Sequence, residues 1–133
     1  HSKDVLRRLP EQYTGDGSRL AFAAVFMDQC GSRFWEDLEE LRRQDLLRPG
    51  AVIVADNVLK PGAPLFLWRT LLGGGPFRGR VVSVPEFAMP GVEDWVAIVE
   101  YRPEAAPLQA SPPPEPPQAV LDLEWEAHCI RLQ

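Results

Sequence analysis

Two short, unbroken apolar runs constrain the fold of this chain more than any other feature of its sequence. They are Leu20–Met27 (LAFAAVFM) and Ala51–Ala55 (AVIVA), and an aspartate follows each of them. A short run without a polar residue is typical of a strand that is buried on both faces of a sheet. The residues between the two runs, 33–47, carry apolar side chains at helical spacing, which predicts an amphipathic helix. Strand, helix and strand in this order are typical of α/β proteins.

The segments on either side continue this alternation. Ser2 is expected to cap a helix over residues 3–13, and a further helix is predicted over about residues 61–72. Two later strands are predicted over residues 79–84 and 95–101, with a turn-rich connection between them. The sequence therefore predicts an α/β fold with a mostly parallel sheet.

The composition changes sharply after Arg102, which predicts three parts of the chain. Residues 1–102 are expected to form the folded domain. Half of the 14 prolines fall in the segment that follows, so residues 103–118 are predicted to be a polyproline II linker. The remaining residues, 119–133, form a tail in which Val120–Glu126 mostly alternates apolar and acidic residues, and this favours a short strand.

Length and composition narrow the class of protein. A chain of 133 residues with 45% apolar and 25% charged residues is typical of one globular domain. Its net charge of −5 argues against a nucleic-acid binder, and it has no apolar run of the ~20 residues that a membrane helix needs. Two cysteines are too few for a disulfide framework or a four-cysteine zinc site, which favours a cytoplasmic protein. Because the sequence begins at His1 without an initiator Met, we expect a piece of a longer chain.

Polar side chains follow both apolar runs at the point where each predicted strand ends. Asp28 follows the first run, and Asp56 with Asn57 follows the second. Parallel strands share the edge at which their carboxyl ends meet, and open α/β sheets bind ligands at this edge. Two carboxylates and one amide are hard oxygen ligands that suit Mg²⁺. The alternative is that each aspartate only caps a turn or the next helix.

The residues around this predicted site resemble the catechol O-methyltransferases. The most specific stretch is Arg48–Pro64 (RPGAVIVADNVLKPGAP), and Val25–Asp28 and Ser83–Phe87 agree with the family in the same order. The resemblance covers residues 1–102 and corresponds to the C-terminal half of the family's domain. It implies a Rossmann-like fold with helices on both faces of the sheet. It also implies methyl transfer from S-adenosylmethionine to a catechol-type hydroxyl.

The resemblance implies a role for individual residues of this chain. Mg²⁺ would be held by Asp28, Asp56 and Asn57, and would chelate both catechol oxygens. A catalytic Glu86 would hydrogen-bond the second hydroxyl, and the substrate would lie against Asn57, Pro61 and Glu86. The residues expected beside S-adenosylmethionine are Ser2, Lys3, Asp28 and Gln29.

Three departures from the family pattern leave an alternative function open. The family has a general-base lysine where this chain has Gly31, and a glycine cannot accept a proton. Gln29 and Cys30 replace a histidine and a tryptophan, and the family's glycine-rich cofactor loop has no counterpart. The alternative is a catalytically weak or inactive scaffold that acts as a binding module. Residues 112–117 offer a proline motif for a partner domain, although a plain linker explains them too.

Overall fold

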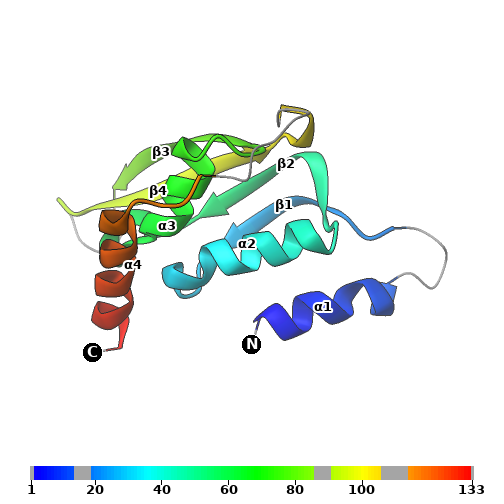
Figure 1. The fold of residues 1–133 in the computed structure, drawn as a ribbon, viewed down its shortest axis with the longest axis horizontal. Coiled ribbons are helices and arrows are strands. Elements are labelled where there is room, and N and C mark those ends of the chain that lie inside the picture. Colours follow the sequence, from blue (N-terminus) through cyan, green and yellow to red (C-terminus); the bar gives the residue numbers. More distant parts are fainter. Residues whose placement is uncertain (1, 14–18, 86–90, 106–113, 133) are drawn as a thin grey trace.

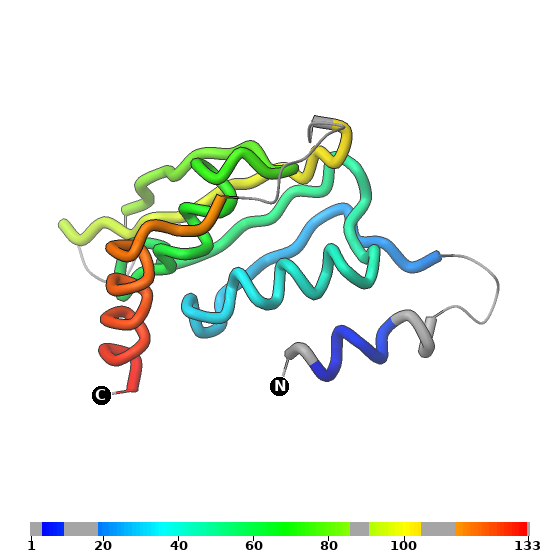
Figure 2. Tube along the Cα trace, viewed as in Figure 1, coloured from blue at the N-terminus to red at the C-terminus, as the bar shows by residue number. Residues whose placement is uncertain are grey.

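The computed structural model describes residues 2–13, 19–85, 91–105 and 114–132 (Figures 1 and 2). Four strands form one sheet: β1 (Phe22–Met27), β2 (Leu47–Ala55), β3 (Phe77–Pro85) and β4 (Glu93–Tyr101). The α-helices are α1 (Ser2–Tyr13), α2 (Phe34–Arg43), α3 (Pro64–Leu67) and α4 (Gln118–Arg131). Short helical turns join them: η1 (Gly31–Arg33), η2 (Val58–Gly62), η3 (Trp68–Leu72) and η4 (Pro103–Ala105). The order of helices and strands up to Tyr101 is the one that the sequence predicts.

The sheet is mixed, and the prediction of a mostly parallel sheet is wrong for this chain. Its strand order is β1-β2-β4-β3, in which β1 and β2 are parallel while β4 is antiparallel to both β2 and β3. The connection between β3 and β4 is too short for a helical crossover, so these two strands can only pair as a hairpin. The parallel pair is therefore confined to β1 and β2, the two strands that carry the predicted metal ligands.

The buried core lies on one face of this sheet. Ile53 of β2 and Val99 of β4 are fully buried there. Helices α2 and α3 cover the same face, because the ring of Phe34 in α2 packs edge-on against Phe66 of α3 at 5.7 Å between centroids. A second edge-on pair at 6.4 Å joins α2 to Phe77 of β3, and Figure 2 shows α2 running beside β1 and β2.

The opposite face of the sheet is open among the described residues. Its apolar side chains include Phe26 of β1, which is 66% exposed, and Val52 and Val84, which are 37% and 41% exposed. The expectations that β1 is buried on both faces and that helices cover both faces are therefore wrong for the described part of the chain. Alternate residues of β1 do point into the core, and Met27 is 2% exposed.

The C-terminal tail is helical, so the predicted strand over Val120–Glu126 is wrong. Helix α4 begins directly after Pro117 and packs against η1, η2 and α3. Its buried and half-buried residues other than Cys129 follow a helical spacing: Val120, Glu124, Ala127, His128 and Arg131. The apolar and acidic alternation favoured a strand, but the inward face of this segment has the period of a helix.

The linker predicted over residues 103–118 is partly attached to the fold. Its first residues form η4, and Arg69 donates a hydrogen bond of 2.9 Å to the carbonyl oxygen of Pro114. Residues 112 and 113 of the proline motif lie outside the described residues, so a partner for this motif stays a prediction without structural support. Within the described ranges, none of the helices has the length and apolar character needed to cross a membrane.

A buried carboxylate links α1 to α2 through hydrogen bonds. Glu40 is 3% exposed and accepts hydrogen bonds from Arg43 at 2.6 and 2.8 Å, from Gln44 at 3.0 Å and from Arg7 of α1 at 3.1 Å. The bonds from Arg43 are the main cause that lowers the pKa of Glu40 from 4.5 to about 2, against the opposing effect of desolvation. This carboxylate therefore stabilises the fold above its ordinary pKa, and the stabilisation is lost as the pH falls towards 2.

We predict that Glu40→Gln lowers the free energy of unfolding at pH 7 and weakens its dependence on pH between about 4.5 and 2. Urea denaturation at several pH values in this range measures both effects. The matched control is Glu39→Gln, which removes an exposed partner of Arg42 on the same helix and is expected to change little. Equal pH dependence in the wild type and in Glu40→Gln would contradict the prediction.

Candidate functional site

The candidate site lies at the carboxyl ends of β1 and β2. The last residues of these parallel strands, Met27 and Ala55, are paired, and the backbone N–H of Asp56 donates to the carbonyl oxygen of Met27 at 2.9 Å. Asp28 and Asp56 thus follow a paired position on neighbouring strands. Asp28 is exposed and Asp56 half-buried, so both carboxylates remain accessible from solvent. The strand pairing places the two acidic residues at one edge of the sheet.

The backbone after Asp56 turns sharply at Asn57. Asn57 has φ 53° and ψ 37°, a left-handed conformation that asparagine adopts more readily than most residues. Its backbone N–H donates to the Oδ1 of Asp56 at 2.9 Å, and its side-chain Nδ2 donates to the Oδ2 of Asp94. The amide nitrogen is thereby held by β4, and the Oδ1 of Asn57 stays available as an oxygen ligand.

Sequence reasoning missed Asp94. It lies at the start of β4, and its second oxygen accepts the backbone N–H of Trp95 at 2.7 Å. Only the pairing of β4 with β2 brings Asp94 to Asn57, because 37 residues separate the two in the chain. An acidic residue before a predicted strand gives no indication in the sequence of which distant residue it contacts.

The residues predicted to bind a metal at this edge carry oxygen donors. Asp28 and Asp56 offer carboxylate oxygens and Asn57 offers an amide oxygen, which is the ligand chemistry that Mg²⁺ prefers. Over the described ranges, no group of three or more His, Cys, Asp and Glu side chains is placed to hold a metal ion. The predicted set contains only two such residues because its third ligand is an amide.

The structure describes Pro61, Ser2 and Lys3 among the other residues predicted from the resemblance. Pro61 lies in η2, which follows Asn57, and it is exposed. Ser2 and Lys3 belong to the first turn of α1. Glu86, the predicted partner of the second catechol hydroxyl, lies outside the described residues.

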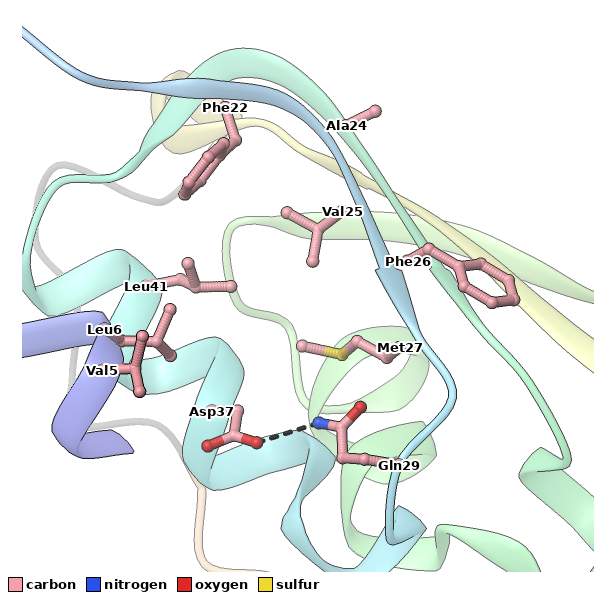
Figure 3. A pocket seen from close by; sticks show the side chains of 10 residues that line it. All are labelled: Val5, Leu6, Phe22, Ala24, Val25, Phe26, Met27, Gln29, Asp37 and Leu41. Carbon is pink, nitrogen blue, oxygen red and sulfur yellow. Dashed lines mark hydrogen bonds between the residues drawn. The ribbon is translucent and has the colours of Figure 1, made fainter. Parts of the chain in front are cut away.

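A pocket of about 500 Å³ opens between α1, β1 and α2 (Figure 3). Its lining is apolar except for two residues, Gln29 after β1 and Asp37 of α2. Figure 3 shows the amide of Gln29 directed towards Asp37, and its Nε2 donates to the Oδ2 of this buried carboxylate at 2.9 Å. Gln29, a predicted cofactor residue, thus shares a pocket with side chains of α1, the helix that begins with Ser2 and Lys3.

Helix α4 occupies the place where a side chain at position 31 would lie. A Cβ built on the buried Gly31 would be 3.1 Å from the Cζ of Arg131 and 2.9 Å from the carbonyl oxygen of Gly62, and it would overlap the Nη2 of Arg131. The guanidinium of Arg131 also donates a hydrogen bond to that carbonyl oxygen. Gly31, which the sequence resemblance places at the family's lysine position, lies where the guanidinium of Arg131 leaves no room for a side chain.

Further contacts hold α4 against α3 and η1. The carboxylate of Glu124 accepts the backbone N–H of Leu65, in the first turn of α3, at 2.9 Å. Partial burial raises the pKa of Glu124, and the bond from Leu65 opposes this shift. Ser32 lies 3.1 Å from both the Nδ1 of His128 and the Sγ of Cys30. These contacts were missed because the sequence interpretation treated the tail as separate from the folded part.

Comparison with solved structures defines the fold class. The O-methyltransferase TomG of Streptomyces achromogenes, solved with S-adenosylmethionine, aligns with a TM-score of 0.58 and 20% identity over 77% of this chain and 47% of its own. An O-methyltransferase of Bacillus cereus, solved with S-adenosylhomocysteine, aligns with the same TM-score and 16% identity over 77% of this chain and 48% of its own. The fold is the Rossmann-like fold of S-adenosylmethionine-dependent O-methyltransferases, as the sequence predicts.

Comparison with curated sequences finds similar O-methyltransferases over part of this chain. Catechol O-methyltransferase of Bos taurus is 39% identical over 66 residues, which are 50% of this chain and 23% of that protein. The transmembrane O-methyltransferase homolog of Mus musculus is 34% identical over 102 residues, or 75% of this chain and 37% of that protein. No protein-family profile matches the chain. The resemblance to the catechol O-methyltransferase family is thereby confirmed for the segment compared, and the chain spans well under half the length of these relatives.

We predict that Glu124→Ala destabilises the docking of α4. The substitution leaves the N–H of Leu65 without its partner, and loss of such a helix-start acceptor costs about 0.5–2 kcal/mol. Urea denaturation measures the loss, with the exposed neighbour Glu126→Ala as the matched control on the same helix. A difference between the two variants that lies within error would contradict the contact.

Proposed function

We propose that this chain forms part of an enzyme that transfers a methyl group from S-adenosylmethionine to a hydroxyl of a catechol-type substrate, with Mg²⁺ as the metal. One observation carries the proposal. The chain is similar to catechol O-methyltransferases, and its parallel strands β1 and β2 end side by side at Asp28 and at Asp56 with Asn57. Both aspartates and the asparagine are the residues to which the sequence resemblance assigns the metal.

Each residue at this edge has its own proposed role in the reaction. Asp28, Asp56 and Asn57 would hold Mg²⁺, and Asp94 would orient the amide of Asn57. When bound, Mg²⁺ would chelate both substrate oxygens and lower the pKa of the attacking hydroxyl. Pro61 would lie beside the aromatic ring, and Glu86 would hydrogen-bond the second hydroxyl. In the transfer, a C–O bond to the substrate forms as the C–S bond of the methyl donor breaks.

The hydroxyl proton would pass to water in this site. Gly31 offers no base, and the guanidinium of Arg131 that fills its space carries hydrogen-bond donors only. A missing general base costs about 10²–10⁴-fold in rate. We therefore expect slow turnover.

The cofactor would lie on the α1 side of β1. Gln29 and α1 residues line the pocket there, and Ser2 and Lys3 begin that helix. The buried carboxylate of Asp37 fixes the Nε2 of Gln29, which leaves its carbonyl oxygen to accept a hydrogen bond from the cofactor.

A binding module without catalysis is the second candidate function. The observation that favours it is Gly31, because the position that should supply the base is filled by a guanidinium from α4. A site of this kind would bind the metal and an aromatic diol without converting it. A measurement of methyl transfer distinguishes the enzyme from the binding module.

We predict that the protein, at its natural length, transfers labelled methyl groups from S-adenosylmethionine to a simple catechol with Mg²⁺, and that EDTA abolishes the transfer. Asp56→Ala removes a predicted metal ligand and is expected to abolish turnover as well. Asp122→Ala is the control, since it removes an exposed carboxylate of α4 that accepts a hydrogen bond from Gln118, away from the predicted ligands. A folded protein that binds both the cofactor and Mg²⁺ but shows no turnover would favour the binding module.

We also predict that Asp94→Ala weakens Mg²⁺ binding by about 10–100-fold, the usual effect of removing a group that orients a metal ligand. The amide of Asn57 loses its only described side-chain partner in this variant. Isothermal titration calorimetry measures the affinity, and Glu93→Ala, an exposed neighbour in β4, is the matched control. Unchanged Mg²⁺ affinity in Asp94→Ala would show that Asp94 does not orient Asn57 for metal binding.

A further inference from the structure

Arg131 joins the two loops that carry the predicted metal ligands. The loop after β1 runs from Asp28 to Gly31, and the loop after β2 runs from Asp56 through Asn57 to Gly62. The guanidinium of Arg131 lies against the backbone of Gly31 and donates to the carbonyl oxygen of Gly62. These two glycines are themselves in close approach, since the Gly62 oxygen would be 2.9 Å from a Cβ at position 31.

The packing at this point depends on the absence of a side chain at position 31. Any side chain at position 31 would displace the guanidinium and press on the carbonyl oxygen of Gly62. The planar guanidinium of arginine has several N–H donors in a rigid fork, so it can bond a carbonyl oxygen while it stacks on the neighbouring backbone. A lysine ammonium has no such flat surface.

Arg131 is itself held in place by its helix. It lies in the last turn of α4, where a cation is favoured by the helix dipole, and its Nη1 is 3.4 Å from the carbonyl oxygen of Ala127. The contacts of Glu124 with Leu65 and of His128 with Ser32 fix α4 on α3 and η1. The guanidinium therefore reaches both loops from a docked helix, not from a free tail.

We propose that Arg131 is a positioning residue of the Mg²⁺ site, which sets the separation between Asp28 and the pair Asp56 and Asn57 by joining their loops. The inference rests on the proposed function, since it concerns the same metal ligands. In this chain the C-terminal helix thus supplies a fixed cation at the place where related enzymes carry a lysine. The cation holds the ligands in position and does not accept a proton.

Calorimetric titration of the natural-length protein with Mg²⁺ tests this role. Arg131→Ala is expected to weaken Mg²⁺ binding by about 10–100-fold, and Arg131→Lys to weaken it less, because lysine retains one donor for the Gly62 oxygen. Free guanidinium ion added at millimolar concentration should restore part of the affinity in Arg131→Ala. The control is Arg42→Ala, which removes an exposed arginine paired with Glu39 on α2, and which should show neither the loss nor the rescue.

A double-mutant cycle separates positioning from general destabilisation. Gly31→Ala puts a methyl group against both the guanidinium and the Gly62 oxygen. It should weaken Mg²⁺ binding in the wild type and less in the Arg131→Ala background, where only the contact with the Gly62 oxygen remains. Additive losses, or Arg131→Ala with wild-type affinity, would overturn the role of Arg131 while leaving the metal site intact. A wild-type protein that binds no Mg²⁺ would overturn the proposed function, and the inference with it. Circular dichroism of each variant shows whether α4 and the sheet remain folded.

Discussion

The parallel pairing of β1 with β2 is the constraint on which the rest of the structure depends. Because the strands run in the same direction and Met27 pairs with Ala55, the residues that follow them leave the sheet at one edge. The turns η1 and η2 follow these strands, and α4 packs against both of them. In an antiparallel pair the same two aspartates would stand at opposite ends of the strands, and no common site would exist.

The sequence was sufficient to predict the strands of the sheet and the edge at which Asp28 and Asp56 follow neighbouring strands. The apolar runs before Asp28 and Asp56 have the length of buried strands, and the spacing of Phe34, Leu38 and Leu41 gives α2 its inward face. These signals are local, since each depends on the order of residues within one segment. They fix which residues follow a strand.

Signals that depend on distant segments were not accessible in this way. The pairing of β4 beside β2 brings Asp94 to Asn57, and the docking of α4 brings Arg131 to Gly31. Neither contact can be predicted from the spacing of residues within one segment. The helical period of α4 was present in the sequence, but the stronger alternation of apolar and acidic residues concealed it.

The position of Arg131 has a consequence for the order in which the site forms. Its contact with Gly31 closes a loop of about 100 residues, whereas the strands pair over much shorter separations. Contacts that close long loops carry the larger entropic cost and tend to form late. The sheet edge would thus be in place before the loops after β1 and β2 are joined. The local stability of the site is then set by the last turn of α4, and fraying of that one turn would loosen the site while every strand stays paired.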